Sequence, residues 1–522
     1  MTHYDVVIVG GGHNGLVSAA YLAKAGLKVL ILERQGQLGG AVQSLQVFKG
    51  VAARLSRYSY LLSLFPQKIS DDLGLRFESR RRAVASFTPT VRDGAHKALL
   101  ISNTDEQRTL ESFRQLTGSD SEYHAFQRFN HLMEVFAEKV WPTLLQPMVT
   151  REAMQARFDD AESREAWEML VEQPLGVGLE RLLQDDRVRG LAFTNAKIGV
   201  LTQPHDPTLL QNRTYIYHII GQGTGEWRVV VGGMGAVSEA LEQCARQAGV
   251  EIITGAAVER IDAQTGQVHY TRGGRSFEVE GAYVLANVAP STLEVMLGRP
   301  EKAQIDPGAV FKINMVLKRL PRLKAAGYSP AEAFTGTFHM DEGYEAMKAS
   351  FQQATQGLLP DQPPGEMYCQ TMTDPSTLAP ELAAQGYHTI TLFGIDIPVR
   401  AFHADNEGTR AETLGRYVKA INQYLDEPLE DCLAVDSDGQ PCIEAKTPLD
   451  LETELGLPQG NIFHKNLTWP FAADAALGGT WGVETEFPRL LICGSGAWRG
   501  GCVSGVPGHN AAMKVLEAMG RR

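Results

Sequence analysis

Hydrophobic residues near the start of the chain fall into short, uninterrupted runs separated by glycine. The first run, residues 6–9, follows Asp5 and ends at three successive glycines, which predicts a buried strand leading into a turn. A helix is expected from about Asn14 to Ala25, because Gly26 then stops the pattern. A second buried strand follows over 28–33. This order predicts the opening βαβ unit of a parallel sheet.

The glycines of this unit have the spacing of a dinucleotide-binding turn. Gly10 allows a tight turn, Gly12 lets the backbone approach a pyrophosphate, and Gly15 lets the helix pack closely on the strand. The positive N-terminus of the helix would face the phosphates. Glu33 lies 18 residues beyond Gly15, where a carboxylate can accept hydrogen bonds from a ribose diol. A dinucleotide site is therefore predicted, against the alternative that the glycines only close a tight turn.

Two later blocks continue the same kind of pattern. The first begins with the glycines of 232–235, continues as a helix to about 248, and ends in predicted strands that include 251–254, 257–261 and 282–287. The second is a strand at 489–493, a glycine-rich stretch and a closing helix from about Pro507. Three separated segments are therefore expected to build one nucleotide-binding domain.

The stretches between these blocks have a different character. Residues 105–200 are mostly helical in pattern, whereas 305–400 contain strand-like runs such as 310–317 and 388–393. The predicted fold class is therefore α/β, a discontinuous Rossmann-like cofactor domain of the glutathione-reductase type with an inserted α+β substrate domain. The predicted boundaries are 1–75, 225–295 and 455–522 for the cofactor domain, and 76–224 and 296–454 for the substrate domain.

Composition narrows the class of protein. The chain has 522 residues, which favours two domains, and a net charge of −12, which argues against a nucleic-acid partner. Its six cysteines include no Cys-x-x-Cys pair, and its first strand begins at residue 4, so a cytoplasmic protein is expected. The basic run 76–82 leaves peripheral membrane contact open, although a solvated surface is its ordinary interpretation. The histidines show no metal-ligand spacing, and no metal is assigned.

Four stretches taken together resemble one family. They are the opening through Gly40, residues 232–261, residues 447–452 and residues 491–512. In this combination the chain resembles the phytoene desaturase-like flavoproteins, in the branch called pyridine nucleotide-disulfide oxidoreductase domain-containing protein 2. The resemblance implies bound FAD and an oxidoreductase activity. Two departures, at 498–503 and 464–466, lie where relatives carry other motifs, so the substrate class does not carry over.

The resemblance also implies which residues hold the cofactor. The first helix would contact the pyrophosphate, Glu33 the adenosine ribose, and the end of the chain the ribityl chain and flavin ring. The expected cofactor-binding residues are Gly10, Gly12, His13, Asn14, Gly15, Glu33, Arg34, Gly39, Gly40, Ala41, Val258, Gly494, Val503 and Ser504.

Four residues are candidates for the chemistry. Arg499 would place a positive charge near the flavin, with a pyrophosphate or surface contact as its alternative. Trp498 would stack on a flat substrate or simply pack beside the closing helix. Lys312 lies within an apolar run, where an ammonium is costly unless paired or functional, and otherwise faces water. His464 is a weaker candidate of the same kind.

Three functions remain open from the sequence. The first is hydride transfer to FAD from an apolar or polyene-like small molecule, in a desaturation, oxidation or isomerisation. The second is oxidation of a polar amine or alcohol on the same fold. The third is an escort-type protein that binds isoprenoid-bearing partners without flavin chemistry, which the intact glycine motifs disfavour. Because no second fingerprint for a nicotinamide is present, oxygen or a quinone is the expected electron acceptor.

Overall fold

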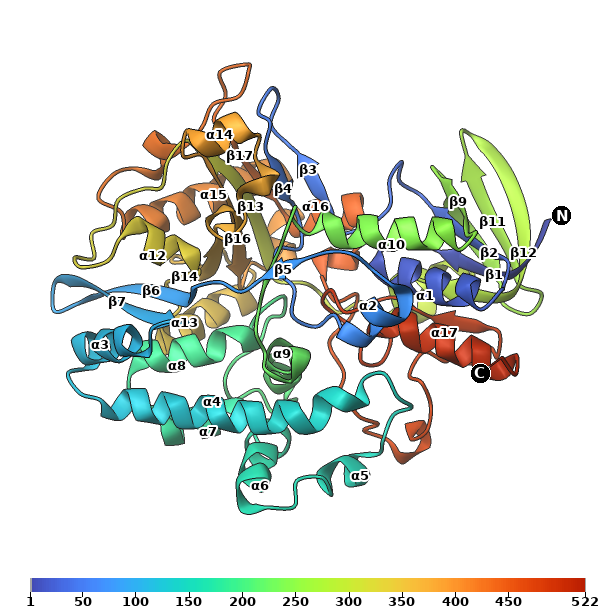
Figure 1. The fold of residues 1–522 in the computed structure, drawn as a ribbon, viewed down its shortest axis with the longest axis horizontal. Coiled ribbons are helices and arrows are strands. Elements are labelled where there is room, and N and C mark those ends of the chain that lie inside the picture. Colours follow the sequence, from blue (N-terminus) through green and yellow to red (C-terminus); the bar gives the residue numbers. More distant parts are fainter. Residues whose placement is uncertain (1, 522) are drawn as a thin grey trace.

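The computed structural model describes residues 2–521 and contains two large sheets that lie side by side (Figure 1). The sheet at the right of the figure contains the first strand, and both ends of the chain lie on that side. The sheet at the left is flanked by two groups of helices, one above it and one below it in this view. The chain passes between the two halves several times.

The first sheet is built from three separated parts of the sequence. Its order is β10-β11-β12-β1-β2-β9, and β18 pairs with β12. Strands β9, β2, β1, β12 and β18 are parallel, whereas β10 and β11 turn back against β12 in an antiparallel hairpin. The strands are β1 (Thr2–Val9), β2 (Val29–Glu33), β9 (Glu251–Thr254), β10 (Ala257–Asp262), β11 (Gln267–Arg272), β12 (Arg275–Ala286) and β18 (Leu490–Ile492).

The two faces of this sheet follow the alternation of side chains along β1. Val6 and Ile8 pack against helices on one face, whereas Val7 and Val9 pack on the other face among residues of β10, β11 and β12. The helices on the first face are α1 (His13–Lys24), α10 (Gly235–Gln247) and α17 (Val506–Ala518). Because both faces are covered, every residue of β2 is buried, as the continuous apolar runs predict.

The second sheet forms the other half of the molecule. Its order is β17-β13-β16-β15-β14-β6-β7. Its strands are β6 (Val84–Arg92), β7 (Ala95–Ser102), β13 (Val310–Leu317), β14 (Thr337–Met340), β15 (Gly365–Tyr368), β16 (His388–Ile395) and β17 (Ile443–Lys446). Two further pairs, β3 (Ser44–Gln46) with β4 (Arg54–Ser56) and β5 (Ser79–Arg80) with β8 (Val229–Val230), lie in the connecting segments.

Helices cover this sheet as well. The remaining helices are α2 (Gln67–Leu73), α3 (Glu106–Thr117), α4 (Ser121–Val140), α5 (Arg151–Gln155), α6 (Ala161–Trp167), α7 (Leu175–Leu182), α8 (Asp186–Phe193), α9 (Leu210–Ile219), α11 (Pro290–Met296), α12 (Pro330–Thr335), α13 (Tyr344–Thr355), α14 (Pro380–Ala384), α15 (Asn406–Asn422) and α16 (Pro448–Leu455). Those between 106 and 219 form a largely separate core of their own, in the lower part of Figure 1.

The alternation of side chains decides which residues of the second sheet face inward. On β14, Phe338 and Met340 pack into the core under α12 and α15, and His339 points the other way. On β15, Met367 joins that core, whereas Glu366 lies on the opposite face. On β13, Ile313 packs into the same core, so Lys312 also lies on the opposite face. That face borders the cavities described below.

The sequence predictions of an α/β fold and of its main elements are confirmed. Strand β9 has the predicted bounds, and so does β13. The predicted segment boundaries stay a prediction, although β6 and β7 do belong to the second sheet, as residues between 76 and 224 should.

Candidate active site

The turn after β1 is tightly constrained at two glycines. Gly10 has a φ of +98°, and a Cβ there would lie 2.8 Å from the carbonyl oxygen of Asn287. A Cβ on Gly15 would lie 2.4 Å from the carbonyl oxygen of Gly10. The Asn287 amide donates a hydrogen bond to that same carbonyl over 3.1 Å. The loop is therefore fixed between the ends of β1 and β12, with the first turn of α1 behind it.

Glu33 is held at the end of β2 by two backbone amides. Its carboxylate accepts a hydrogen bond of 2.7 Å from Gly11 N and one of 2.8 Å from Gln35 N. The side chain is buried but borders the cavity in front of the glycine turn. Because each carboxylate oxygen has a second lone pair, Glu33 can still accept hydrogen bonds from a diol.

A cavity of about 430 Å³ begins at this turn and runs to the second sheet. Most of the predicted cofactor residues line it, from all three segments of the first sheet and its loops. Those lining it are Gly10, Gly12, His13, Asn14, Glu33, Arg34, Gly39, Gly40, Ala41, Val258 and Val503, and the candidates Lys312 and His464 lie in the same wall.

Four polar atoms in this wall are buried and have no hydrogen-bond partner among the described residues. They are His13 Nε2, Asn14 Oδ1, His464 Nδ1 and Lys312 Nζ. Burial lowers the pKa of both His13 and His464 to about 4, so both rings are neutral near pH 7. Buried polar atoms are normally paired, so these four fit a large ligand that carries its own donors and acceptors. A dinucleotide with a flavin ring is such a ligand.

Three predicted cofactor residues do not reach the cavity wall. Gly15 is buried inside the first turn of α1, where it permits close packing. Gly494 packs against Asn287, whose Oδ1 would lie 3.0 Å from an added Cβ. Ser504 is buried and accepts a hydrogen bond from Val506 N at the start of α17. These residues shape the site from behind.

Two of the four candidates for chemistry lie outside the cavity. Arg499 is 1% exposed, and its guanidinium donates to the backbone carbonyls of Thr143, Gln146 and Trp481 over 2.7–3.0 Å. Trp498 donates from its indole nitrogen to the carbonyl of Phe471 over 3.1 Å. The structure therefore does not bring these residues to the reacting centre. Arg499 instead ties the end of the chain to the segment after α4.

Replacing Arg499 with alanine is expected to destabilise the protein and to leave its cofactor spectrum unchanged. Three buried carbonyls would lose charged donors, at a cost of about 3 kcal/mol or more in the free energy of unfolding. Chemical denaturation measures this loss. Arg489→Ala, which removes one exposed guanidinium bonded to the carbonyl of Gln264, is the control. A stable Arg499 variant with an altered flavin spectrum would contradict the structural role.

Other cavity residues were not predicted from the sequence. Asn287 contacts the glycine turn, and its place at the carboxyl end of the predicted strand 282–287 was the available signal, since such ends meet at one edge of a parallel sheet. Tyr60 also lines the cavity and stacks on Tyr368, with ring centroids 4.3 Å apart. The predicted connector 54–60 therefore does contribute to the site through its last three residues.

A second cavity of about 700 Å³ adjoins the first. Five residues belong to both walls, namely Tyr60, Leu61, Ile198, His218 and Trp227. The second cavity also contains Arg82, which is buried and donates to the Thr337 hydroxyl over 2.9 Å. The expectation that the basic run 76–82 is simply solvated surface is therefore wrong for its last residue.

The fold and the cavity together define a dinucleotide-binding flavoprotein. The flavin containing amine oxidoreductase family matches residues 15–337, and the chain belongs to that family. It is accordingly an FAD-dependent oxidoreductase. Among residues 2–521, no helix combines the length and the apolar character that crossing a bilayer requires.

Three relatives cover nearly the whole chain. The chain is 43% identical to uncharacterized protein Rv0897c of Mycobacterium tuberculosis, over 99% of this chain and 98% of the relative. It is 30% identical to pyridine nucleotide-disulfide oxidoreductase domain-containing protein 2 of Rattus norvegicus, over 98% and 93%, which confirms the predicted branch. It is 24% identical to one subunit of the limonene dehydrogenase of Castellaniella defragrans, over 99% and 95%.

Solved structures share the fold at low identity. Cyclohexylamine oxidase from Brevibacterium oxydans matches with a TM-score of 0.58 and 15% identity, over 99% of each chain. The likeness supports the α/β flavoprotein architecture.

Replacing Glu33 with alanine is expected to weaken FAD binding about 10-fold to 100-fold. Hydrogen bonds to a carboxylate contribute about 1.5–3 kcal/mol, and each 1.4 kcal/mol corresponds to a factor of ten in affinity. Titration of the flavin-free protein with FAD, followed by flavin fluorescence, measures the change. Glu259→Ala, at an exposed position of β10, is the matched control. Equal affinities for both variants would show that Glu33 does not contact the cofactor.

Proposed function

We propose that this enzyme transfers a hydride to FAD from a small molecule with an apolar body, held in the second cavity. The observation that carries the proposal is the shared wall of Tyr60, Leu61, Ile198, His218 and Trp227. A molecule in the second cavity would meet the end of the first cavity that contains Lys312 and Tyr60. The predicted glycine-turn contacts would hold the other end of the cofactor.

The walls of the second cavity differ in character. Helices α4 and α9 supply Phe126, Phe129, Met133, Tyr215 and Ile219, which make one side largely apolar. This side supports an apolar or terpene-like substrate, as does the similarity to part of a limonene dehydrogenase.

Lys312 is the residue we propose for proton transfer. Its Nζ is buried, lies 4.3 Å from the centre of the Tyr60 ring and has no hydrogen-bond partner among the described residues. Burial lowers the pKa of Lys312 well below its ordinary value, which favours a neutral amine. When bound, the flavin supplies the hydride acceptor. The neutral amine of Lys312 can accept the proton that a substrate loses when its hydride leaves.

His464 is proposed to contact the cofactor rather than the substrate. It lines the first cavity but not the second, and its neutral ring points an unpartnered Nδ1 at the cavity. The reduced cofactor is proposed to pass its electrons to oxygen or to a quinone.

The second candidate function is oxidation of a polar amine or alcohol. The observation in its favour is the other side of the second cavity, where β14 and β15 present Thr337, His339, Glu366 and Tyr368. A neutral Lys312 suits this reaction equally, because an amine or alcohol must also lose a proton.

The test is anaerobic reduction of the purified flavoprotein. A cyclic terpene hydrocarbon, a linear polyene, and a cyclic amine and alcohol of similar size are added in turn, and bleaching of the flavin absorbance is recorded. Bleaching by the hydrocarbon or the polyene supports the first function, and bleaching by only the amine or alcohol supports the second. A protein that neither contains nor takes up FAD would overturn both. Re-exposure to air, or addition of a soluble quinone, then identifies the electron acceptor.

A variant that fills the second cavity tests where the substrate lies. Asn130→Trp projects from α4 into this cavity and is expected to slow bleaching at least about 10-fold while FAD is retained. Glu138→Trp, at an exposed position of the same helix, is the control and should behave as the wild type. Unchanged bleaching in Asn130→Trp would place the substrate elsewhere.

A further inference from the structure

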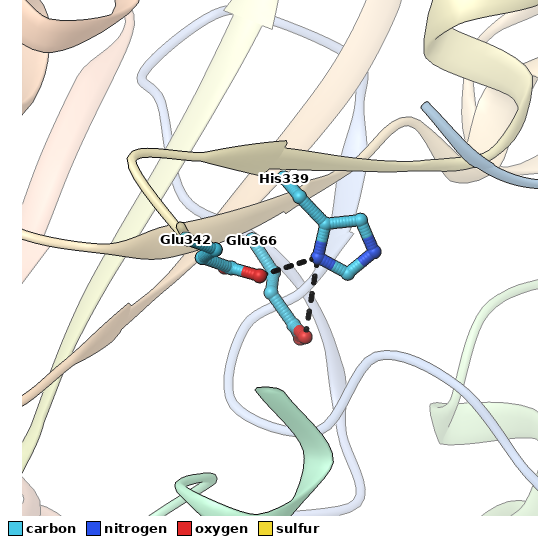
Figure 2. A group of neighbouring side chains, drawn as sticks. All are labelled: His339, Glu342 and Glu366. Carbon is cyan, nitrogen blue, oxygen red and sulfur yellow. Dashed lines mark hydrogen bonds and ion pairs between the residues drawn. The ribbon is translucent and has the colours of Figure 1, made fainter. Parts of the chain in front are cut away.

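Three metal-ligating side chains meet in the polar wall of the second cavity. His339 comes from β14, Glu342 from the turn that follows it, and Glu366 from β15 (Figure 2). His339 Nδ1 lies 2.6 Å from Glu342 Oε2 and 3.7 Å from Glu366 Oε1. One nitrogen and two carboxylate oxygens thus lie within 4.8 Å of one another. The sequence analysis assigned no metal, because Glu366 joins the other two only through strand pairing.

The two carboxylates are buried without a cationic partner. The side chains of Glu342 and Glu366 are 0% and 3% exposed, and neither has a lysine or arginine within ion-pair distance among residues 2–521. Arg82, in the same cavity, donates to the Thr337 hydroxyl instead. Glu342 Oε1 is buried with no hydrogen-bond partner among the described atoms. Buried charges in proteins are usually paired or coordinate a metal, and these carboxylates lack a basic side chain to pair with.

The surroundings of Glu366 hold its carboxylate in place. Thr194 donates its hydroxyl to Glu366 Oε1 over 3.2 Å, and the Tyr368 hydroxyl donates to Glu366 Oε2. Such hydrogen bonds to a ligating carboxylate are typical of metal sites, where they orient the ligand. In Figure 2 the imidazole and both carboxylates point toward one another.

We propose that His339, Glu342 and Glu366 bind one divalent transition-metal ion, Zn²⁺ or Mn²⁺. A mixed set of one imidazole and two carboxylates suits these ions, whereas Ca²⁺ and Mg²⁺ prefer oxygen ligands alone. Ligand distances of about 2.0–2.2 Å require only that the hydrogen bond between His339 and Glu342 opens to admit the ion. Since His339 and Glu366 line the second cavity, the remaining coordination position faces it and would take water or an oxygen or nitrogen atom of a bound molecule. The site is independent of which molecule the flavin oxidises.

The test is metal binding by the intact flavoprotein. The protein is stripped with a chelator, desalted and titrated with Zn²⁺ alone by calorimetry, and bound metal is counted by elemental analysis. One equivalent is expected in the wild type, and His339→Ala and Glu366→Gln are each expected to weaken its binding at least 100-fold. The flavin spectrum of each variant checks that it has folded.

His131→Ala is the matched control. His131 lies on the surface beside Glu162 and Glu134, at 3.1 and 4.0 Å, where Zn²⁺ would bind adventitiously. This variant should still bind one equivalent tightly, and Zn²⁺ should raise the melting temperature of the wild type but not of Glu366→Gln. The proposal is overturned if the wild type binds no stoichiometric Zn²⁺ or Mn²⁺. It is also overturned if binding is lost in His131→Ala and kept in His339→Ala.

Discussion

Gly12→Val is expected to yield a folded protein that has lost its flavin. Gly12 lines the first cavity and caps α1 with φ −70° and ψ 170°, a conformation that valine also adopts. The loop should therefore still form. A Cβ on Gly12 would already lie 3.2 Å from the Asn287 amide nitrogen, and the two methyl groups of valine would extend into the space predicted for the pyrophosphate. The expected defect is steric and confined to the cofactor.

The flavin content of the purified variant measures this loss. We expect less than about a tenth of the wild-type ratio of flavin to protein, since blocking the pyrophosphate removes the contacts for which the glycines are required. The far-ultraviolet circular dichroism spectrum should match that of the flavin-free wild type. Gly415→Val is the control, because Gly415 is exposed on α15 and an added Cβ there has no neighbour within 4 Å. A fully flavinated Gly12 variant would refute the placement of the pyrophosphate.

The cofactor half was predictable from the sequence because its signals are local. The strand, turn, helix and strand through Glu33 occupy one short stretch, and the glycines are needed wherever the backbone is crowded or has positive φ. Strand β13 was likewise predicted with its observed bounds, since it pairs on both sides and is buried on both faces, which gives an uninterrupted apolar run.

The roles of charged residues were less predictable because they depend on distant partners. Arg499 follows a glycine-containing strand end, which suggested the flavin, yet its guanidinium bonds the carbonyl of Thr143, 356 residues earlier. Arg82 ends a basic run typical of a surface, yet it is buried beside β14. No local pattern reports a contact of this kind.

Some features of the site depend on backbone conformation that composition does not reveal. His464 and Cys502 line the first cavity with φ of 69° and 53°, values that are unusual for residues other than glycine. Such conformations persist where the surrounding structure enforces them, and they gather at functional sites. Both residues lie in the stretches where the chain departs from its relatives' motifs.

Lys312→Met is expected to make the protein more stable and the enzyme slower. The amine of Lys312 is buried without a hydrogen-bond partner, and such a group costs about 1–3 kcal/mol. Methionine fills similar space without that cost. If Lys312 takes the substrate proton, its loss should slow flavin reduction at least about 100-fold. Urea unfolding and anaerobic single-turnover reduction measure the two effects.

The stability gain should depend on pH. Burial lowers the pKa of Lys312 in the folded state well below 10.5, so the unfolded chain binds an extra proton between the folded pKa and 10.5. The stability of the wild type therefore rises with pH through this window. The advantage of the methionine variant is largest at low pH, and it shrinks as pH approaches 10.5 because the unfolded lysine then also loses its proton.

Lys197→Met is the matched control, since it removes a second buried lysine that does have a partner. Lys197 lies 2.8 Å from Asp396, and both side chains are 0% exposed. Removing Lys197 leaves a buried carboxylate unpaired and is expected to cost about 3–5 kcal/mol. The two lysine variants should therefore shift stability in opposite directions. A destabilised Lys312 variant would mean that its amine has a partner in the folded enzyme, and unchanged flavin reduction would remove Lys312 from the chemistry.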